Sequence, residues 1–241
     1  MSLKGHTFKS FMLCFIFLAP IALLIFLQPD LGNALIYVFV ALGTLLIFGF
    51  PLKLFFGGFL LWLISLPLFW LMLHDYQRHR ILTFLNPGGD PLGTSYNAIQ
   101  SVIAVGSGML MGRGLGQGTQ AGLKFLPERH TDFIFATISE ELGFIGAVII
   151  IICFLVIFYR IFVIIKNGED KFLRIFSLIF FMTLFTHFFI NIGMNLGIVP
   201  IVGVTLPFVS YGGSSLLSNF IFLGLLFALN RKKRREVLEI G

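Results

Sequence analysis

Long apolar stretches alternate with short polar connections along this chain. Six of the stretches are rich in Phe, Leu, Ile and Val, approach or exceed about 18 residues, and lack the two-residue alternation of a membrane β-strand. Because about 20 apolar residues form a helix that crosses a bilayer, the pattern predicts an all-α, polytopic membrane protein. The predicted spans are about residues 10–27, 33–50, 53–73, 136–165, 172–192 and 213–230.

The composition supports this class of protein. Of the 241 residues, 57% are hydrophobic and only 12% are charged, whereas a soluble domain carries about 25% charged residues. We expect a single membrane domain over residues 1–241. The predicted span at 136–165 is long enough to tilt or to protrude from the bilayer. Within the long connection 74–135, the part 96–112 is apolar enough to form an interfacial or re-entrant helix.

The distribution of Lys and Arg predicts the orientation, because cytoplasmic loops of membrane proteins are enriched in these residues. Placing both ends inside puts 12 of the 17 Lys and Arg residues, including the basic tail 231–235, on the cytoplasmic side. The segment 74–135, the loop near 193–212 and the short turn at 28–32 then face the extracytoplasmic side. The basic tail also suits anionic membrane lipids, and no nucleic-acid partner is expected.

Charge is concentrated just before the fourth span, in KFLPERHTDFIFATISEELGF (124–144). Asp132 follows Thr131 directly ahead of the apolar run. One interpretation is a helix N-cap or first-turn acid, which the helix dipole stabilises. The other is a general base or a cation ligand at the membrane surface. Both can hold together, because a helix N-terminus keeps a carboxylate ionised, and an ionised carboxylate can accept a proton or hold Mg²⁺.

Two further acids, Glu140 and Glu141, fall inside the predicted span. Ionisable groups within spans usually face the bundle interior or a cavity. If the helix includes Asp132, Glu140 lies roughly 80° from it on the helical wheel and Glu141 about 180°. Glu140 is then the better candidate to share a cavity with Asp132, and a structural pairing with a basic residue is equally open. Asp30, in QPDLG (28–32), is expected to cap the second span or to pair with an Arg.

Two glycine-rich segments lie on the same predicted side. GSGMLMGRGLGQGTQ (106–120) fits neither phosphate-binding glycine pattern. It is either a close-packed turn or a loop whose N–H groups and Arg113 approach an anionic head group. PIVGVTLPFVSYGGSS (200–215) carries Ser210 but no GxSxG elbow, which argues against a Ser–His–Asp hydrolase. It predicts a re-entrant loop lining a polar cavity, into which Asn191 and Asn195 would hydrogen-bond.

Six stretches together resemble the SEDS family of bacterial cell-wall proteins, which includes RodA, FtsW and sporulation homologues. They are QPDLGNA (28–34), RILTFLNPGGDPLGTSYNAIQS (80–101), GRGLGQGTQ (112–120), FLPERHTDFIFATISEELGFIG (125–146), NIGMNLGIVP (191–200) and LPFVSYGGSS (206–215). FLPERHTDFIF with GQGTQ is more similar to RodA than to FtsW. Family members usually have ten spans with QPDLG near the middle, so the resemblance implies that about four N-terminal spans are missing. The chain would then be a fragment, a split gene product or a mis-started reading frame, and such a piece can be inactive alone.

The resemblance implies a peptidoglycan glycosyltransferase that polymerises lipid II on the outer face of the bacterial cytoplasmic membrane, in cell elongation, shape and division. It also implies a class B penicillin-binding protein as partner and Asp132 as the essential acid. We expect Asp132 to act as a base and to be the candidate ligand of a divalent cation, Mg²⁺ or Mn²⁺. The candidate substrate-binding residues are Arg113, Lys124, Arg129, Glu140 and Ser210, with Arg78 and Arg80 as alternatives for the pyrophosphate and Asp30 and Asn191 as structural polar residues.

Two other classes of function stay open. Intramembrane acids with a glycine-rich re-entrant loop also suit a flippase or transporter of a lipid-linked precursor. A non-catalytic scaffold that activates a transpeptidase is the third possibility. Polymerisation of purified lipid II by the wild-type protein, and its loss in Asp132→Asn, would separate the enzyme from both alternatives.

Overall fold

The computed structural model describes residues 8–239 except 29, 90–94, 123–124 and 169. Regular structure in these residues is entirely helical, which confirms the all-α expectation. The α-helices are α1 (Phe8–Leu27), α2 (Leu31–Ile47), α3 (Leu52–Met72), α4 (Asp75–Leu85), α5 (Tyr96–Ser107), α6 (Thr119–Gly122), α7 (Ile134–Asn167), α8 (Lys171–Asn195) and α9 (Gly213–Glu239), and a 3-10 turn covers Pro87–Gly89.

Six of the helices stand where the sequence predicts spans, but they differ in length. Among the described residues, four stretches are long and apolar enough to cross a membrane: Leu52–Met72, Ile134–Asn167, Lys171–Asn195 and Gly213–Arg231. The apolar stretches Met12–Leu27 and Gly32–Ile47 are shorter. At 1.5 Å per residue, the 17 residues of α2 extend about 25 Å, somewhat less than the roughly 30 Å hydrocarbon core of a bilayer.

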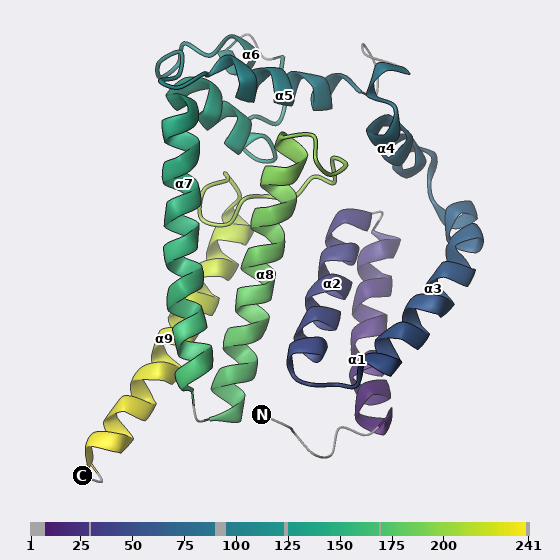
Figure 1. The fold of residues 1–241 in the computed structure, drawn as a ribbon, viewed down its shortest axis with the longest axis vertical. Coiled ribbons are helices and arrows are strands. Elements are labelled where there is room, and N and C mark those ends of the chain that lie inside the picture. Colours follow the sequence, from purple (N-terminus) through teal and green to yellow (C-terminus); the bar gives the residue numbers. More distant parts are fainter. Residues whose placement is uncertain (1–7, 29, 90–94, 123–124, 169, 240–241) are drawn as a thin grey trace.

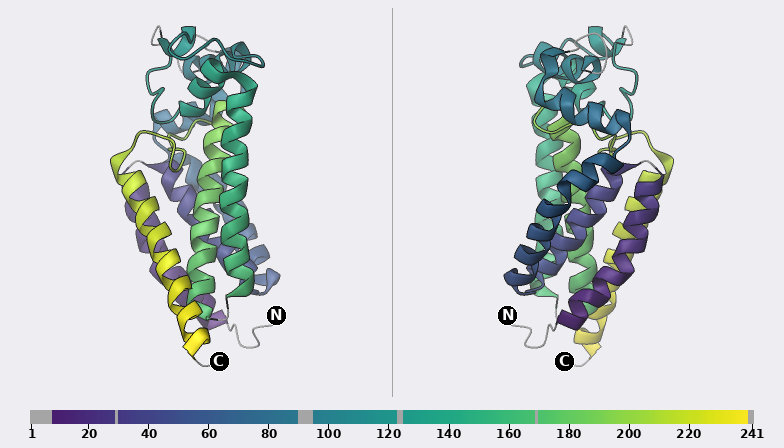
Figure 2. Two further views of the ribbon diagram at one scale, coloured as in Figure 1. Left: turned by 90° about the vertical axis from the view of Figure 1, so that its left-hand side faces the viewer. Right: turned by 90° about the vertical axis from the view of Figure 1, so that its right-hand side faces the viewer.

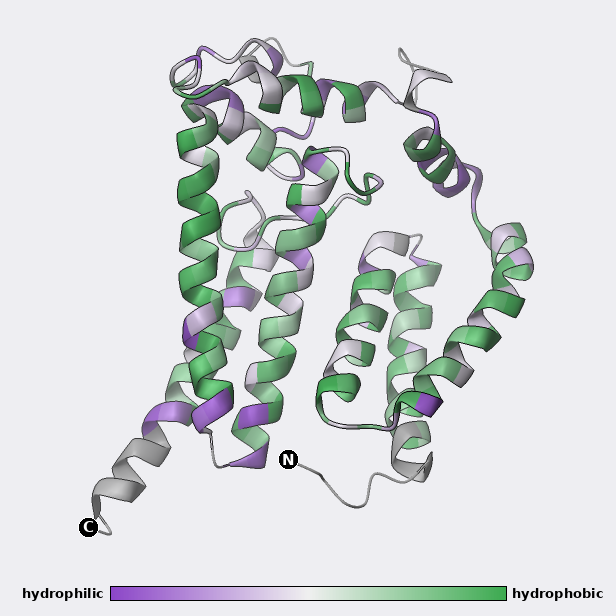
Figure 3. Ribbon diagram, in the orientation of Figure 1, coloured by the Kyte–Doolittle hydropathy of each residue, from purple (hydrophilic) through white to green (hydrophobic). Residues whose placement is uncertain are grey.

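α7 and α8 pack side by side as an antiparallel pair, and α8 lies between α7 and α2 (Figures 1 and 2). The apolar core of this pair includes several phenylalanines, and the ring of Phe154 lies 4.7 Å from that of Phe188, centroid to centroid. α2 packs on the other side of α8 through a second apolar cluster that includes Ile36 and Met182. α3 has no buried residue, and apolar side chains such as Ile64 are exposed, as lipid-facing side chains would be. Figure 3 shows that most of this helix is hydrophobic.

The polar elements gather at one end of the bundle. α4, α5, α6 and the irregular segment 196–212 lie there, while the start of α1 and the end of α9 lie at the opposite end (Figures 1 and 2). This arrangement agrees with the predicted placement of both ends on one side of the membrane. That this side is the cytoplasm stays a prediction. α5 lies across the end of α7, which it contacts through a buried face with Ser101 and Ala104.

The fourth predicted span, 136–165, lies within α7, and this helix has a kink at Gly143. This residue has φ 69° and ψ −162°, outside the helical region. The glycine-rich segment 108–114 fills the gap by bonding to the freed backbone groups. Arg113 N donates to Glu140 O at 2.9 Å, Gly114 N donates to Glu141 O at 3.0 Å, and Phe144 N donates to Met109 O at 2.8 Å.

Glycines make this close approach possible. A Cβ on Gly108 would overlap the carbonyl of Ser139, and a Cβ on Gly112 would overlap the carbonyl of Glu141. Of the two interpretations that the sequence left open for the segment 106–120, the structure therefore supports the close-packed turn.

Candidate functional site

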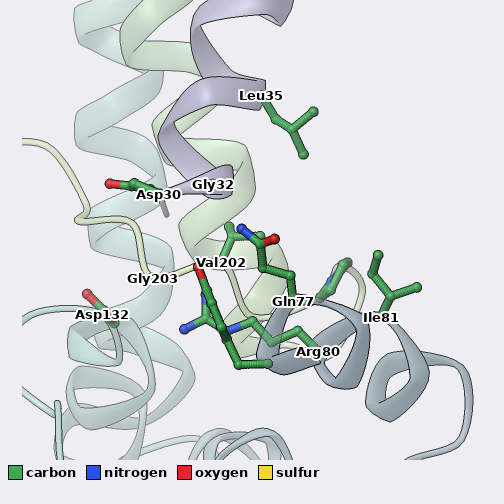
Figure 4. Close-up of a pocket in the computed structure, with 11 residues that line it drawn as sticks. Asp30, Gly32, Leu35, Gln77, Arg80, Ile81, Asp132, Val202 and Gly203 are labelled. Carbon is green, nitrogen blue, oxygen red and sulfur yellow. The ribbon is translucent and has the colours of Figure 1, made fainter. Parts of the chain in front are cut away.

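A cavity of about 400 Å³ opens at the polar end of the bundle (Figure 4). Four segments far apart in the sequence form its walls: the start of α2, α4, the turn before α7, and the irregular segment after α8. Its lining residues are Asp30, Gly32, Leu35, Tyr76, Gln77, Arg80, Ile81, Asp132, Pro200, Val202 and Gly203. The cavity thus brings together two carboxylates, a guanidinium and an amide.

Asp132 lies in the turn before α7 and not in the helix. The N-cap of α7 is Phe133, and the first turn contains no acidic residue. The prediction of an N-cap or first-turn acid is therefore wrong. The prediction that Glu140 shares a cavity with Asp132 assumed a helix that includes both residues, and Glu140 is not among the residues that line this cavity.

The backbone of Asp132 is held by two buried amides of α8. Asn191 Nδ2 donates to Asp132 O at 2.9 Å, and Asn195 Nδ2 donates to the same oxygen at 3.0 Å. Both asparagines are completely inaccessible to solvent. Because both amides bond to the main chain, the Asp132 carboxylate is left to the cavity. Asn191, which was predicted as a structural polar residue, and Asn195 thus bond to the backbone beside the cavity, and neither is among its lining residues.

Asn195 also joins α5 and α7 to α8. Its Oδ1 accepts a hydrogen bond from Ala136 N at 3.1 Å, and its backbone oxygen accepts one from Ser101 Oγ at 3.0 Å. The N–H groups of a first helical turn have no partner within the helix, so Asn195 supplies one for α7. A single side chain therefore ties together the elements that position Asp132.

The irregular segment after α8 forms the wall beside Asp132. Gly203 has φ +71°, and a Cβ on it would lie 3.3 Å from Asp132 Oδ2. A Cβ on Gly32 at the start of α2 would lie 2.5 Å from the carbonyl oxygen of Val202. Only glycine at position 32 allows the start of α2 to approach the backbone at Val202 so closely. The segment predicted as a re-entrant loop has no regular helix up to the start of α9, and its residues Val204 and Leu206 are buried. Its entry into the bilayer stays a prediction.

Burial raises the pKa of the Asp132 carboxyl above its ordinary value, and the negative charge of Glu128 raises it further. A hydrogen bond from Thr131 and the positive charge of Arg80 act in the opposite direction. Figure 4 shows the Arg80 side chain extending from α4 toward the side of the cavity where Asp132 lies. Among the residues of this site, Arg80 is the cation that acts on Asp132.

The sequence offered Arg80 only as an alternative, and it offered no role for Tyr76 or Gln77. The usable signal was the spacing of these residues, because side chains four apart, such as Tyr76 and Arg80, share one face of a helix. The Arg80 guanidinium lies 5.7 Å from the centroid of the Tyr76 ring, within the range of a cation–π contact.

Asp30 lines the cavity and caps α2, as predicted. Its Oδ1 accepts a hydrogen bond from Asn33 N at 3.0 Å, and its Oδ2 accepts one from Asn33 Nδ2 at 2.7 Å. The described residues contain no group of three or more His, Cys, Asp or Glu side chains that could hold a metal. Asp132 and Asp30 fit the looser arrangement in which one or two carboxylates and substrate phosphates hold Mg²⁺.

Among the described residues, the predicted site residues Arg113, Arg129 and Glu140 do not line this cavity. Arg113 is exposed and donates from Nε to Ser107 O at 3.4 Å, and Arg129 donates from Nε to His130 Nε2 at 3.1 Å. Glu140 is fully buried, and its Oε1 accepts hydrogen bonds from Thr119 Oγ1 at 3.2 Å and Gln120 N at 2.9 Å. Their roles in substrate binding stay predictions, and Lys124 lies outside the described residues.

Ser210 is a structural contact of the Asp132 turn. Its hydroxyl donates to Thr131 O at 2.6 Å and accepts from Leu206 N at 2.7 Å. It lines a separate hollow of about 530 Å³ together with His130, Tyr211 and neighbouring apolar residues. Ser210 therefore holds the backbone of this turn, and its role in substrate binding stays a prediction.

The helical bundle and its polar cavity define a multi-pass membrane protein with a site at one end that contains carboxylate, guanidinium and amide groups. Residues 3–235 match the model of the FtsW/RodA/SpoVE family, described as cell cycle protein. The chain belongs to this family, as the sequence resemblance predicts.

Two curated relatives illustrate the match. The chain is 41% identical over 213 residues to the peptidoglycan glycosyltransferase MrdB of Escherichia coli (strain K12), covering 88% of this chain and 58% of the relative. It is 37% identical over 238 residues to the probable peptidoglycan glycosyltransferase FtsW of Nitrosomonas europaea, covering 96% of this chain and 61% of the relative. The chain thus spans about three fifths of the length of either relative.

Solved structures show the same fold. A chain of a peptidoglycan synthase complex that coordinates polymerization and crosslinking matches with a TM-score of 0.77 at 31% identity, covering 96% of this chain and 64% of that chain. A crystal structure of a mutant of the rod shape determining protein RodA from Thermus thermophilus matches with a TM-score of 0.62 at 26% identity, covering 95% of this chain and 60% of that chain.

Proposed function

We propose that the chain carries the catalytic site of a peptidoglycan glycosyltransferase, which polymerises lipid II on the outer face of the bacterial cytoplasmic membrane. The observation that carries the proposal is the Asp132 carboxylate, which lies in a cavity opposite Arg80 and whose pKa is raised by burial. The names of the curated relatives support the reaction class. Because the chain spans only part of their length, activity of the whole protein remains part of the proposal.

The reaction joins two sugars with inversion at the donor carbon. The 4-hydroxyl of the acceptor sugar attacks C1 of the donor, its proton passes to a carboxylate oxygen of Asp132, and the bond between C1 and the pyrophosphate oxygen breaks. A sugar hydroxyl is a poor nucleophile, so a positioned base lowers the barrier. The raised pKa makes Asp132 a stronger base than an exposed aspartate, which suits this role.

The leaving pyrophosphate develops negative charge, which a cation in the cavity wall would stabilise. Arg80 is positioned for this, and guanidinium groups match phosphate oxygens in a bidentate geometry. A divalent cation, Mg²⁺ or Mn²⁺, bound by Asp132 and by substrate phosphates would neutralise further charge on the pyrophosphate. Asp30 is the second carboxylate of the cavity that such an ion could reach.

The surroundings of the cavity suit a substrate with a lipid tail. Leu35 and Ile81 contribute apolar lining beside the polar groups, and the long helices of the bundle are mostly hydrophobic along their length (Figure 3). A polyprenyl chain can therefore remain in the bilayer while its head group enters the cavity. We propose a class B penicillin-binding protein as partner, because one similar chain belongs to a synthase complex that couples polymerization to crosslinking.

The test is polymerisation of purified lipid II by the full chain in lipid vesicles. The wild type is expected to form glycan strands, and Asp132→Asn is expected to form none while melting as a folded protein. Asp75→Asn is the matched control, because Asp75 is an exposed carboxylate at the start of α4 that lies outside the cavity.

Polymer formed by a folded Asp132→Asn chain would exclude Asp132 as the base. If the chain moves lipid II across the vesicle membrane and forms no polymer, the result favours a flippase over a glycosyltransferase. A wild-type chain that does neither would overturn the proposed function for this chain.

A further inference from the structure

One buried donor in the cavity wall has no partner. Gln77 is only 3% exposed, and its Nε2 makes no hydrogen bond. The amide orientation is fixed by its other atom, because Gln77 Oε1 accepts a hydrogen bond from His74 N at 3.0 Å, and a backbone N–H can only donate. Ser95 Oγ and Gln120 Oε1 are the other buried unpaired side-chain atoms among the described residues. Of the three residues, only Gln77 lines the cavity.

An unpaired buried donor is costly. Leaving one unsatisfied costs about 1–3 kcal/mol, and buried polar groups in folded proteins are nearly always bonded. When such a group lines a cavity, a ligand oxygen in that cavity is the simplest partner. Figure 4 shows the Gln77 side chain leaving α4 toward the segment that carries Val202.

The neighbours of Gln77 indicate what kind of ligand this is. Arg80 follows three residues later, so the neutral amide and the cation lie on one face of α4. A guanidinium suits phosphate oxygens, whereas an amide N–H₂ suits an uncharged oxygen such as a hydroxyl or an acetamido carbonyl. A sugar joined to a phosphate presents these two kinds of acceptor next to each other.

We propose that Gln77 is a sugar-binding residue, whose Nε2 donates to an uncharged oxygen of the sugar while Arg80 faces the attached pyrophosphate. This inference rests on the proposed function, and it adds the residue that distinguishes a sugar-bearing lipid from a bare lipid pyrophosphate. The wall formed by α4 thus binds the head group, and Asp132 on the facing wall acts on it.

Two substitutions separate this role from a structural one. Gln77→Glu keeps an oxygen for the His74 N–H, as glutamate commonly does at this position of a helix start, but it removes the donor. Gln77→Met removes the acceptor and the donor without adding charge. His79→Gln is the control, because His79 is an exposed residue of α4 that does not line the cavity.

The experiment measures equilibrium binding of two fluorescent lipids to the full chain in nanodiscs: lipid II, and undecaprenyl pyrophosphate, which has no sugar. Both Gln77 variants are expected to weaken lipid II binding about 3- to 10-fold, the range of one lost hydrogen bond. For Gln77→Glu this loss is measured at high salt, where repulsion of the phosphates is screened. Gln77→Met is expected to bind undecaprenyl pyrophosphate as the wild type does, whereas Arg80→Gln is expected to weaken both lipids.

Three outcomes would overturn the assignment. Wild-type affinity of Gln77→Glu for lipid II would show that the amide serves only the start of α4 or a bound water. Equal losses for both lipids in Gln77→Met would indicate a general distortion of the cavity. If the wild-type chain binds neither lipid, the cavity does not bind a lipid-linked pyrophosphate and the assignment is refuted.

The proposed glycosyltransferase function and the proposed Gln77–sugar contact can be refuted independently. If the wild type forms polymer but lipid II binds the Gln77 variants as tightly as the wild type, only the sugar contact is refuted. Conversely, if lipid II binding depends on Gln77 but the chain forms no polymer, the sugar contact is supported and the glycosyltransferase function is refuted.

Discussion

Replacing Asn195 by Leu tests whether the turn that carries Asp132 is held by α8. Leucine has a similar shape to asparagine but no hydrogen-bonding group. The substitution removes the hydrogen bond to the backbone oxygen of Asp132 and the one that Ala136 N donates to Asn195 Oδ1. It also removes the bond from Asn195 Nδ2 to Asn191 O at 2.7 Å.

The expected loss of stability follows from which groups keep a partner. The oxygen of Asp132 still accepts a hydrogen bond from Asn191, and Ser101 Oγ still donates to the backbone oxygen of residue 195. Ala136 N is left without its partner in the first turn of α7, which costs about 1–3 kcal/mol. Interhelical hydrogen bonds in membrane proteins contribute about 0.6 kcal/mol each on average. With two further bonds lost, the free energy of unfolding should fall by about 2–4 kcal/mol.

The assay is reversible unfolding of the full chain in mixed detergent micelles, followed by lipid II polymerisation under folding conditions. Asn219→Leu is the matched control, because Asn219 Nδ2 bonds only locally, to Ser215 of the same helix. It should change stability by less than about 1 kcal/mol. Since a displacement of about 1 Å can cost a catalyst about 100-fold, polymerisation by Asn195→Leu should fall at least about tenfold. Stability and activity equal to those of Asn219→Leu would refute the reasoning.

Three further predictions concern charge and backbone. Glu128 raises the pKa of Asp132 and Arg80 lowers it. Glu128→Gln should therefore move the acidic limb of the pH–activity profile to lower pH, and Arg80→Gln should move it to higher pH. A shift of both variants in the same direction would contradict this. Burial raises the pKa of Asp132 from 3.8, so ionisation of this carboxyl destabilises the folded chain. Asp132→Asn should therefore have a higher melting temperature than the wild type at neutral pH, but not below about pH 3.8. Equal melting temperatures at neutral pH would count against this. Gly143→Ala should abolish folding, because φ is +69° and a Cβ would overlap Gly112 N, whereas Gly106→Ala meets no atom within 4 Å and should melt like the wild type.

The sequence was sufficient for the helical class and for the positions of the apolar helices, because both follow from the length and composition of continuous segments. The cap formed by Asp30 was predictable for the same reason, since the residue and the helix it caps are adjacent. Local signals therefore predicted local structure.

The interruption of α7 could not be found in this way. The apolar pattern around Gly143 is the same for a continuous helix and for a broken one. What decides between them is the contact with the segment 108–114, about thirty residues earlier, whose backbone groups replace the missing helical bonds. A single glycine in a helical pattern is tolerated at a cost of about 1 kcal/mol, so its presence alone does not indicate a break.

Which cation lies nearest to Asp132 in space could not be predicted from the sequence for a related reason. Sequence distance favours Arg129, three residues from Asp132, over Arg80, which is more than fifty residues away. In the fold, the Arg129 side chain bonds to its neighbour His130, while α4 brings Arg80 into the cavity. Proximity along the chain is a poor guide where a long connection folds back over the end of a bundle.

The organisation of the site explains why its residues come from such distant segments. A buried carboxylate with a raised pKa destabilises the folded state, so its position must be enforced by contacts that do not touch the carboxylate itself. Asn191 and Asn195 do this by bonding to the main chain of Asp132. The carboxylate is thereby held in place without being neutralised, and Arg80 on the facing wall is left to balance charge in the cavity. Stability supplied by α8 is what permits an unfavourable, and therefore reactive, group at the end of the bundle.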